Sequence, residues 1–293
     1  MPELPDLTVY LERIEAHSAG TALRQLRIGN PFVLRTVEPR REAFAGKRLL
    51  GTRRIGKRLV LDFEGGLHAV IHLMILGRLR WAKPGAALPK SGGLAAFDFE
   101  RGSLLLIEHG KKRRAALHLV EGEAALAQFE RGGLEVMQAD IAAFQAALAR
   151  ENHTLKRALT DPRILAGIGN AYSDEILHRA RLSPFKQTQG LTAEETGQLF
   201  AATRMVLEDW TQRLRAEAGS GWPEKVTAFR PDMAVHGRYK LPCPDCGAPV
   251  QRIVYADNEA NYCARCQTGG RLLADRALSR LLHDSWPKTL DEL

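Results

Sequence analysis

Hydrophobic and polar positions follow two different periods in two parts of the chain. Between residues 23 and 107, short runs of apolar residues alternate with polar ones and are separated by glycine turns such as Gly65-Gly66 and Gly92-Gly93. This pattern is typical of antiparallel strands. The predicted strands are Leu23–Ile28, Arg48–Arg54, Leu59–Phe63, His68–Leu73, Ala96–Phe99 and Leu104–Ile107. An amphipathic helix is predicted before them, over residues 7–18. Many short strands favour a sandwich or a barrel, and we predict an N-terminal antiparallel β-sandwich with an N-terminal helix, ending near residue 130.

The pattern changes to helical periods after Arg131-Gly132-Gly133, which we interpret as a hinge. Helices are predicted over 139–150, 153–160, 169–181 and 192–217, so the second domain, 131–230, is expected to be mainly helical. A cysteine module at 231–270 and a polar tail at 271–293 complete the chain, and the tail has one predicted helix at about 271–284. The predicted fold class is therefore α+β and multidomain.

Composition narrows the class of function. Lys and Arg number 42 against 34 Asp and Glu, a formal net charge of +8, and 45% of residues are hydrophobic. A basic surface attracts polyanions, although charge alone leaves nucleic acid, acidic protein and membrane surface open. No apolar run approaches the ~20 residues of a membrane span, and residues 1–20 do not have the pattern of a signal peptide. We expect a cytoplasmic protein with no membrane partner.

All four cysteines lie close together in the sequence. Cys243 and Cys246 form one CxxC pair, Cys263 and Cys266 form another, and 16 residues separate the pairs. This spacing is typical of two knuckles that hold one tetrahedral Zn²⁺. Four thiolates leave no open position, so the ion is expected to be structural; iron in the same geometry stays open.

A glycine turn precedes the third predicted helix. Residues 165–172 place Gly167 and Gly169 before Asn170 and Tyr172, and small residues let a phosphate approach the N–H groups at a helix start. Lys156, one helix earlier, is a candidate for the same phosphate. The alternatives are an ordinary tight turn with Asn170 as helix cap, and a solvated lysine.

The chain opens Met1-Pro2-Glu3, and removal of Met1 would leave a proline amine beside a carboxylate. A terminal amine titrates near pH 7 to 8, so a useful fraction is unprotonated and nucleophilic at neutral pH. The alternative is structural: Pro2 and Pro5 stiffen the start of a helix whose N-cap is Asp6.

These motifs together resemble one family. The N-terminal PELPD, the GKRLVL strand with Lys57, the LKRAL segment before LAGIGNAYSDEIL, and the four-cysteine finger occur in the order found in formamidopyrimidine/endonuclease VIII DNA glycosylases. The resemblance covers about residues 1–267. It implies a helix-two-turn-helix domain at 131–230, a zinc finger at 231–270, and a bifunctional DNA glycosylase and AP lyase of base excision repair that acts as a monomer on damaged DNA in the bacterial cytosol.

The resemblance also implies roles for individual residues. Pro2 matches the family nucleophile that attacks C1′ of the damaged nucleotide, Glu3 its carboxylate that assists ring opening, and Lys57 its lysine that contacts phosphate and supports elimination. Lys156 and Asn170 match the phosphate contacts around the flipped nucleotide. Further residues assigned to DNA binding on the same basis are Gly169, Tyr172, Arg54, Met74, Ile75, Arg113 and Arg114.

Three departures from the family pattern bear on the substrate. Ala115 stands where a phenylalanine wedge is usual, after the aligned Arg113 and Arg114. Alanine cannot fill the space that a flipped base leaves in the stack, so Met74 or Ile75 is the candidate to fill it. The alternative is that both are core residues. Asn258 stands where the finger usually presents an arginine, between two acidic neighbours; Arg252 or Arg265 are candidate substitutes. The segment 219–238 is short for a loop that covers an oxidised purine, which disfavours 8-oxoguanine.

Two further function classes compete with the repair enzyme. A non-catalytic binder of damaged or structured DNA would keep the fold, and Ala115 and Asn258 are consistent with weakened base flipping. A zinc-ribbon scaffold for protein contacts would explain the finger alone. The enzyme is the preferred hypothesis, because Pro2, Glu3 and Lys57 have little reason to coexist in a pure binder.

Overall fold

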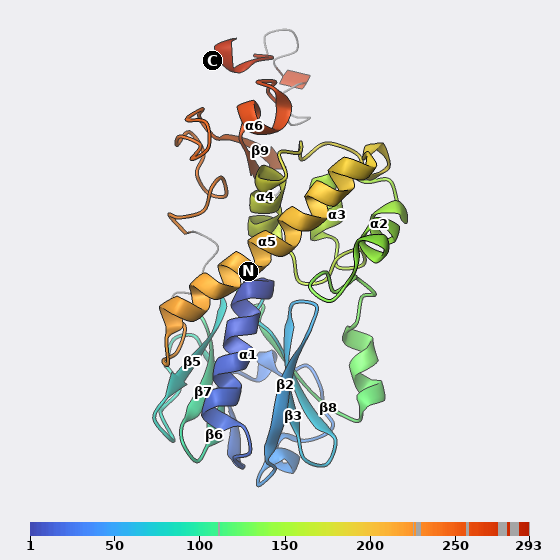
Figure 1. Ribbon diagram of the computed structural model, residues 1–293. Coiled ribbons are helices and arrows are strands. Elements are labelled where there is room, and N and C mark those ends of the chain that lie inside the picture. Colours follow the sequence, from blue (N-terminus) through green and yellow to red (C-terminus); the bar gives the residue numbers. More distant parts are fainter. Residues whose placement is uncertain are drawn as a thin grey trace. The chain divides into compact units, whose positions relative to one another are not determined.

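The computed structural model describes residues 1–110, 112–224, 226, 230–255, 258–274, 280–281 and 287–292 (Figure 1). The chain forms two compact units that are not consecutive stretches of sequence. One unit is Met1–Arg131 with Trp210–Thr227, and the other is Gly132–Asp209 with Ala228–Leu293. Helix α5 (Ala193–Ala218) therefore contributes residues to both.

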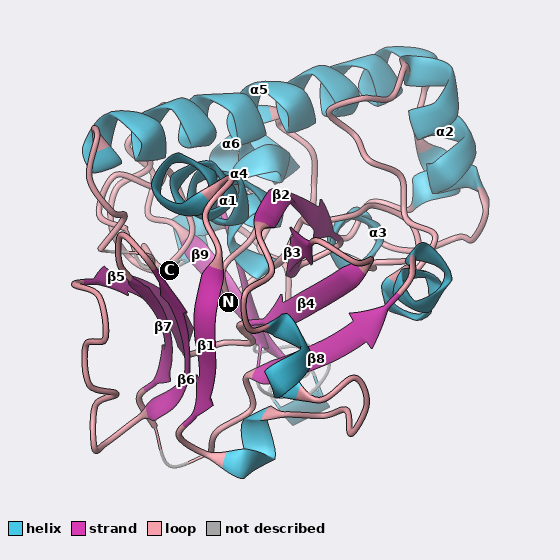
Figure 2. Ribbon diagram, turned by 90° about the horizontal axis from the view of Figure 1, so that it is seen from below, coloured by secondary structure: helices cyan, strands magenta, loops and turns pink. Residues whose placement is uncertain are grey.

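The first unit is built on two four-stranded antiparallel sheets that face each other in Figure 2. One sheet has the order β1-β6-β7-β5, formed by Leu23–Ile28, Gly93–Phe99, Ser103–Glu108 and Gly77–Ala82. The other has the order β2-β3-β4-β8, formed by Leu49–Ile55, Arg58–Phe63, Leu67–His72 and Ala116–Glu121. The predicted β-sandwich is confirmed.

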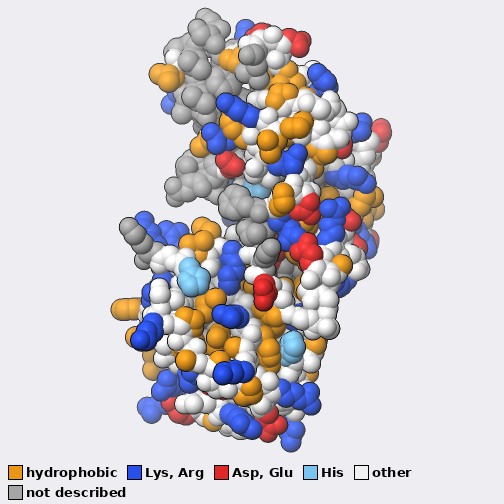
Figure 3. All heavy atoms as spheres, turned by 90° about the vertical axis from the view of Figure 1, so that its left-hand side faces the viewer, with side chains coloured by type: hydrophobic (Ala, Val, Ile, Leu, Met, Phe, Trp, Pro, Cys, Tyr) orange, Lys and Arg blue, Asp and Glu red, His pale blue; other side chains and the backbone are white. Residues whose placement is uncertain are grey.

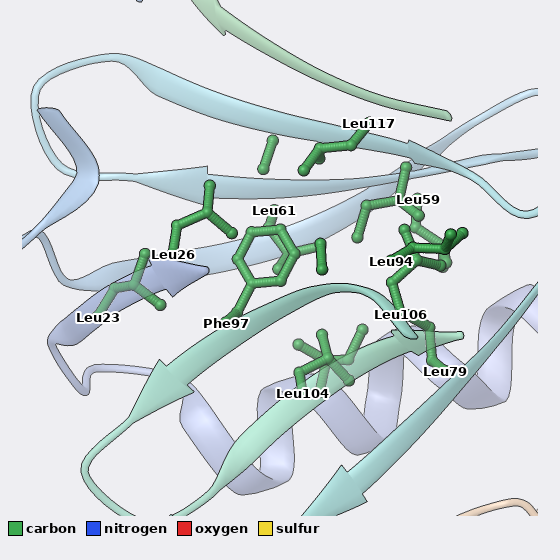
Figure 4. Packing of buried hydrophobic residues seen from close by; sticks show 14 of the residues in the cluster. Leu23, Leu26, Leu59, Leu61, Leu79, Leu94, Phe97, Leu104, Leu106 and Leu117 are labelled. Atoms are coloured by element: carbon green, nitrogen blue, oxygen red, sulfur yellow. The ribbon is translucent and has the colours of Figure 1, made fainter. Parts of the chain in front are cut away.

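Alternate apolar residues of both sheets fill the space between them. Leu59 and Leu61 of β3 meet Leu104 and Leu106 of β7, all almost completely buried, and Phe97 of β6 packs among them (Figure 4). Complete burial of each such side chain contributes about 1.5–3 kcal/mol to folding. The alternating pattern that predicted the strands thus also forms the core.

Helix α1 (Leu4–Ser18) lies against an edge strand of each sheet. The Thr52 N–H of β2 donates to Glu15 Oε1 at 2.8 Å, and the Leu79 N–H of β5 reaches the Tyr10 hydroxyl at 3.4 Å. An unpaired sheet edge is a site of aggregation unless it is covered. The N-terminal helix therefore protects the edge strands β2 and β5 of the sandwich.

Short 3₁₀ helices complete this unit at Pro31–Val33 (η1), Arg41–Phe44 (η2) and Glu123–Phe129 (η3). Leu126 and Phe129 of η3 pack on Val60, Val70 and Val120, on the outer face of the second sheet.

Two strands of the sandwich are absent from the sequence prediction, β5 and β8. Both are edge strands, and each is only partly buried. Both segments alternate apolar with polar residues, as with Leu79 and Trp81 against Arg78 and Arg80 in β5, and a charged run precedes β8. The prediction of six strands was incomplete because it missed this alternation.

The second unit begins with helices α2 (Ile141–Ala149), α3 (Leu155–Thr160) and α4 (Asn170–Arg179), a 3₁₀ turn η4 (Thr188–Gly190), and the start of α5. The predicted helical content of this region is confirmed. A hairpin of β9 (Gln251–Tyr255) and β10 (Asn258–Tyr262) follows, then α6 (Ala264–Thr268) and η6 (Leu290–Glu292).

The tail departs from its prediction. Arg271 forms an isolated bridge with Thr289, and residues 272–274 are not helical, so the predicted helix over 271–284 is wrong at its start. The cause is tertiary pairing: the Leu272 N–H donates to Lys288 O, and the Leu290 N–H donates to Gly270 O. Arg280 and Leu281 are helical, while 275–279 and 282–286 lie outside the described residues. No helix in the described ranges has the length and hydrophobicity that crossing a membrane requires.

Candidate functional site

Two carboxylates hold the first turn of α1. Glu3 is the N-cap, in an extended conformation, and Asp6 is the third residue of the helix. The Glu3 N–H donates to Asp6 Oδ2 at 2.9 Å, while the Glu3 carboxylate accepts from the Asp6 N–H. This capping box satisfies the first N–H groups of the helix. The alternative with Asp6 as N-cap is therefore wrong, and the helix starts at Leu4 rather than at residue 7.

The terminal amine of Met1 lies in surroundings that lower its pKa. Burial is the largest cause, and Arg78 and Lys57 lower the pKa further, whereas Glu3 and Asp6 oppose the shift. Removal of Met1 would make the nitrogen of Pro2, a buried residue directly before Glu3, the terminal amine. A depressed pKa increases the unprotonated fraction of an amine at neutral pH, and the unprotonated amine is the nucleophile.

Cationic side chains gather around the β2–β3 turn. Lys57 follows Gly56 in this two-residue turn, and Arg54 Nη1 donates to Gly56 O at 2.6 Å. His72 lies opposite Arg58 in the β3–β4 register. Burial lowers the pKa of His72 to about 4, and Arg58 and Lys57 contribute to the shift. This end of the sandwich therefore presents lysine and arginine charges beside an imidazole that is neutral at pH 7.

An exposed apolar turn joins β4 to β5. Met74 has a left-handed φ of +54°, and the side chains of Ile75 and Leu76 follow it, with Ile75 54% exposed. The Gly77 N–H closes the turn on Leu73 O, and a Cβ at Gly77 would lie 2.2 Å from that oxygen. Glycine is thus required there. The turn holds Ile75 outside the core, as insertion into DNA would need, and Met74 is half-buried.

A buried carboxylate shapes the loop that precedes β8. Glu108 is 1% exposed and accepts the N–H groups of Arg114 and Ala115 at 2.8 and 2.9 Å. Ala115 packs in the sandwich core, whereas the side chains of Arg113 and Arg114 are exposed. Lys111 lies outside the described residues. The loop therefore presents two arginines to solvent, and Glu108 holds the backbone of the second of them, Arg114.

The glycine turn of the second unit leads directly into α4. Gly167 has φ +84°, Gly169 is the N-cap of α4, and Asn170 is its first residue. The alternative with Asn170 as helix cap is wrong, since the residue before it has the capping conformation. Asn170 is half-buried, whereas Gly169 and Tyr172 are buried.

Lys156 holds this turn from inside. The side chain is buried, and its Nζ donates to Asn170 O at 2.8 Å, Ser173 Oγ at 2.8 Å and Asp174 Oδ1 at 2.6 Å. An ammonium group has three protons, so these bonds occupy all of its donors. The alternative of a solvated lysine is therefore wrong, and contact of Lys156 with phosphate stays a prediction.

The four cysteines flank the β9–β10 hairpin and converge. Their sulfur atoms all lie within 4.8 Å of one another, with Cys246 to Cys263 at 3.4 Å and Cys243 to Cys266 at 3.9 Å. Four thiolates at about 2.3 Å from a tetrahedral Zn²⁺ are about 3.8 Å apart. The separations and the donor set fit one structural zinc ion.

The finger arginines have internal partners. Arg252 stacks over the Tyr239 ring at 4.4 Å and lies 3.7 Å from Glu259, while Arg265 Nη1 donates to Cys246 O at 3.3 Å. The backbone of Asn258 begins β10, and Asp257 lies outside the described residues.

Each unit therefore gathers part of the predicted site. The first holds Pro2, Glu3, Lys57, Arg54, Met74, Ile75, Arg113 and Arg114, and the second holds Lys156, Gly169, Asn170, Tyr172 and the four cysteines. Lys and Arg side chains are spread over the face drawn in Figure 3, with acidic side chains among them.

The sequence analysis gave no role to two residues, Arg78 and Glu108. Arg78 lowers the pKa of the Met1 amine and donates to Ile75 O at 3.0 Å. The alternation of Arg78 and Arg80 with Leu79 and Trp81 is the sequence pattern that could have placed Arg78 on the polar face of a strand.

Comparison with known proteins matches most of the chain to one family. Residues 1–118 match the formamidopyrimidine-DNA glycosylase N-terminal domain, residues 134–215 the H2TH domain of the same enzymes, and residues 240–269 the zinc finger found in FPG and IleRS. The formamidopyrimidine-DNA glycosylase of Thermus thermophilus is 34% identical over 281 residues, which cover 92% of this chain and 100% of the relative. An uncharacterized formamidopyrimidine-DNA glycosylase-like protein of Mycobacterium tuberculosis is 42% identical over 149 residues, 51% of this chain and 90% of the relative.

Solved structures agree with these matches. The crystal structure of the MutM (Fpg) protein from Thermus thermophilus superposes with a TM-score of 0.76 at 33% identity, over 91% of this chain and 98% of that one. The Lactococcus lactis Fpg, in a complex with DNA that contains an abasic site, shares the fold with a TM-score of 0.79 at 23% identity, over 91% of this chain and 99% of that one. This chain belongs to the formamidopyrimidine-DNA glycosylase family.

Proposed function

We propose that this chain is a DNA glycosylase of base excision repair that also cleaves the strand, with Pro2 as its nucleophile after Met1 is removed. One observation supports the proposal: burial, together with the cations Arg78 and Lys57, lowers the pKa of the Met1 amine, and Pro2, whose nitrogen becomes the terminus when Met1 is removed, is the next residue and is buried. We expect the Pro2 amine to share this shift, which would leave it able to attack at neutral pH. The name of the Thermus relative supports ring-opened formamidopyrimidine bases as substrates.

The chemistry follows from a secondary amine beside a carboxylate. The Pro2 nitrogen forms a bond to C1′ as the bond from C1′ to the base breaks, and the base leaves with the proton that the Pro2 nitrogen gives up. Glu3, in its carboxylic acid form, then delivers a proton to the ring oxygen as the bond from C1′ to that oxygen breaks, which yields an iminium ion between Pro2 and C1′ and leaves Glu3 as the carboxylate. Loss of the C2′ proton then expels the 3′ phosphate by elimination, and water releases the enzyme. Lys57 supports the elimination by contact with a phosphate.

Access to C1′ requires the nucleotide to leave the duplex, at a cost of a few kcal/mol. We assign that energy to phosphate contacts from the Asn170 turn and from Lys57 and Arg54, and to an apolar side chain, Ile75 or Met74, that fills the vacated stack. Arg113 and Arg114 face the DNA from the neighbouring loop. Lys156 acts here as a positioning residue for the turn.

Borohydride trapping tests the proposal. Mature protein, with loss of Met1 verified by intact mass, is expected to form a covalent adduct with DNA that carries an abasic site. The control is the same chain with additional residues ahead of Met1, in which the Pro2 nitrogen is an amide and no adduct is expected. Equal trapping by both forms, or none by the mature form, would exclude Pro2 as nucleophile.

A second function, a non-catalytic binder of damaged DNA, is favoured by one observation. Ala115 is buried in the sandwich core and presents no wedge. This alternative predicts that the mature chain binds abasic DNA more tightly than intact DNA, yet neither forms an adduct nor cleaves the strand.

A further inference from the structure

Helix α4 carries a buried polar face that the proposed chemistry does not use. Asp174, Glu175 and His178 are 1%, 5% and 4% exposed. Buried polar and charged groups destabilise a fold unless they are bonded. All three side chains have partners in the part of the second unit that leads into the cysteine cluster or belongs to it.

The two carboxylates fix the segment ahead of the first cysteine. Glu175 accepts three consecutive backbone N–H groups, from Ala234, Val235 and His236, at 2.7, 2.9 and 2.9 Å. Asp174 Oδ2 lies 2.8 Å from His236 Nδ1, while its Oδ1 accepts from Lys156. The chain therefore reaches the cysteine module from a backbone already attached to α4.

His178 makes the corresponding contact with the cluster itself. Its Nε2 lies 3.3 Å from Cys243 Sγ and 3.9 Å from Asp245 Oδ2. The sulfur is the nearer of the two acceptors and the only one within hydrogen-bond reach, because 3.9 Å is too long for a nitrogen–oxygen bond. N–H donors to the ligands of a metal fix their orientation and adjust their electron donation.

We propose that His178 is a positioning residue of the zinc finger, whose Nε2–H donates to the Cys243 thiolate and thereby attaches the metal cluster to α4. The helix thus carries the Asn170 turn at one end and the cysteine contact at the other. The proposal rests on the zinc assignment and is independent of the chemistry at Pro2, so failure of the trapping experiment would leave it intact.

The rate of zinc release tests the contact between His178 and Cys243. In the zinc-loaded full chain, His178→Phe removes the donor but keeps an aromatic ring, and we expect zinc transfer to a chromophoric chelator to become at least about tenfold faster. His178→Gln restores an N–H near the position of Nε2 and is expected to stay within about threefold of wild type. The control His153→Phe replaces the histidine beside Glu151 and is expected to release zinc at the wild-type rate.

Cobalt substitution distinguishes the loss of a hydrogen bond to the Cys243 sulfur from a general loss of stability of the zinc finger. In the Co²⁺-loaded chain, loss of the N–H makes the thiolate a stronger donor, so His178→Phe is expected to shift the sulfur-to-cobalt charge-transfer band to longer wavelength, and His178→Gln to restore it. Asp245→Asn is expected to leave the band unchanged. An unshifted band in His178→Phe, or the same shift in Asp245→Asn, would overturn the proposal.

A measurement on the wild-type chain covers the case in which His178→Phe does not fold. In protein loaded with ¹¹³Cd²⁺, the His178 ring proton is expected on Nε2 and coupled to the metal across the hydrogen bond. A His178 ring that carries its proton on Nδ1 instead would refute the donation to Cys243.

Discussion

Single residues at the start of α1 combine a structural task with a chemical one. Glu3 and Asp6 satisfy each other's backbone N–H groups, and the same two carboxylates raise the pKa of the Met1 amine against the effect of burial. A carboxylate held by a capping box keeps a fixed position, so its distance to the amine is set by the helix. The element that begins the fold thereby also positions the proposed nucleophile.

The lowered pKa of the Met1 amine leads to a prediction for the Pro2 amine that replaces it as the terminus. The reactive form is unprotonated, so the rate of adduct formation is expected to rise with pH through the pKa of the Pro2 amine and then level off, with a midpoint below the ordinary value of about 8 for a terminal amine. Because Arg78 lowers the pKa of the Met1 amine, Arg78→Gln is expected to move this midpoint to higher pH. Arg101→Gln, in the β6–β7 turn, serves as the control without a shift. A midpoint that is the same in all three proteins would contradict the assignment.

Ile75 tests the role of the exposed apolar turn. Because its side chain is 54% exposed, Ile75→Ala is expected to change the free energy of unfolding by no more than about 0.5 kcal/mol. Affinity for abasic DNA is expected to fall about tenfold, since a side chain that fills an emptied stack offsets part of the few kcal/mol that unstacking costs. Val37→Ala, at another exposed apolar position of the same unit, is expected to change neither quantity. Parallel losses of affinity in both variants would exclude a specific role for Ile75.

At the scale of elements, the sequence correctly predicted those strands and motifs whose pattern lies within a few neighbouring residues. Strand β1 and the cysteine knuckles match their predictions because alternation and ligand spacing act over a few neighbouring residues. Lys156 could not be interpreted in this way, since its acceptors Ser173 and Asp174 lie on another helix. Only tertiary structure shows that the lysine is internal.

The burial of Lys156 predicts a loss of stability on substitution. Lys156→Met leaves Asp174 buried without its cation, so the free energy of unfolding, measured by urea denaturation, is expected to fall by roughly 3–5 kcal/mol. The exposed neighbour provides the control: Arg157→Ala is expected to cost at most about 0.5 kcal/mol. Wild-type stability of Lys156→Met together with weaker DNA binding would instead indicate an ammonium that faces phosphate.

At the scale of the whole molecule, the compact units are assembled from separated stretches of sequence. Trp222 explains why the first unit includes residues 210–227: its ring lies 5.7 Å from that of Tyr10 and 6.1 Å from that of Trp81, and its Nε1–H donates to Leu79 O at 2.8 Å. Arg215 adds a two-pronged ion pair with Glu12. Contacts between residues so distant in sequence leave no periodic signal, so the sequence could not indicate this return of the chain.

The net charge of +8 gives a prediction at the same scale, because salt dependence sums every phosphate contact of the protein. The logarithm of DNA affinity is expected to fall linearly with the logarithm of salt concentration. Each phosphate that the protein neutralises contributes about −0.9 to the slope of this line. Arg113→Gln and Arg114→Gln are each expected to lower the slope by about 1 if their exposed side chains contact phosphate. Arg163→Gln is the matched control, since Arg163 is paired with Asp161 at 2.7 Å and is expected to leave the slope unchanged. Equal slopes for all four proteins would place the phosphate contacts on other residues and remove the loop before β8 from the DNA-binding surface.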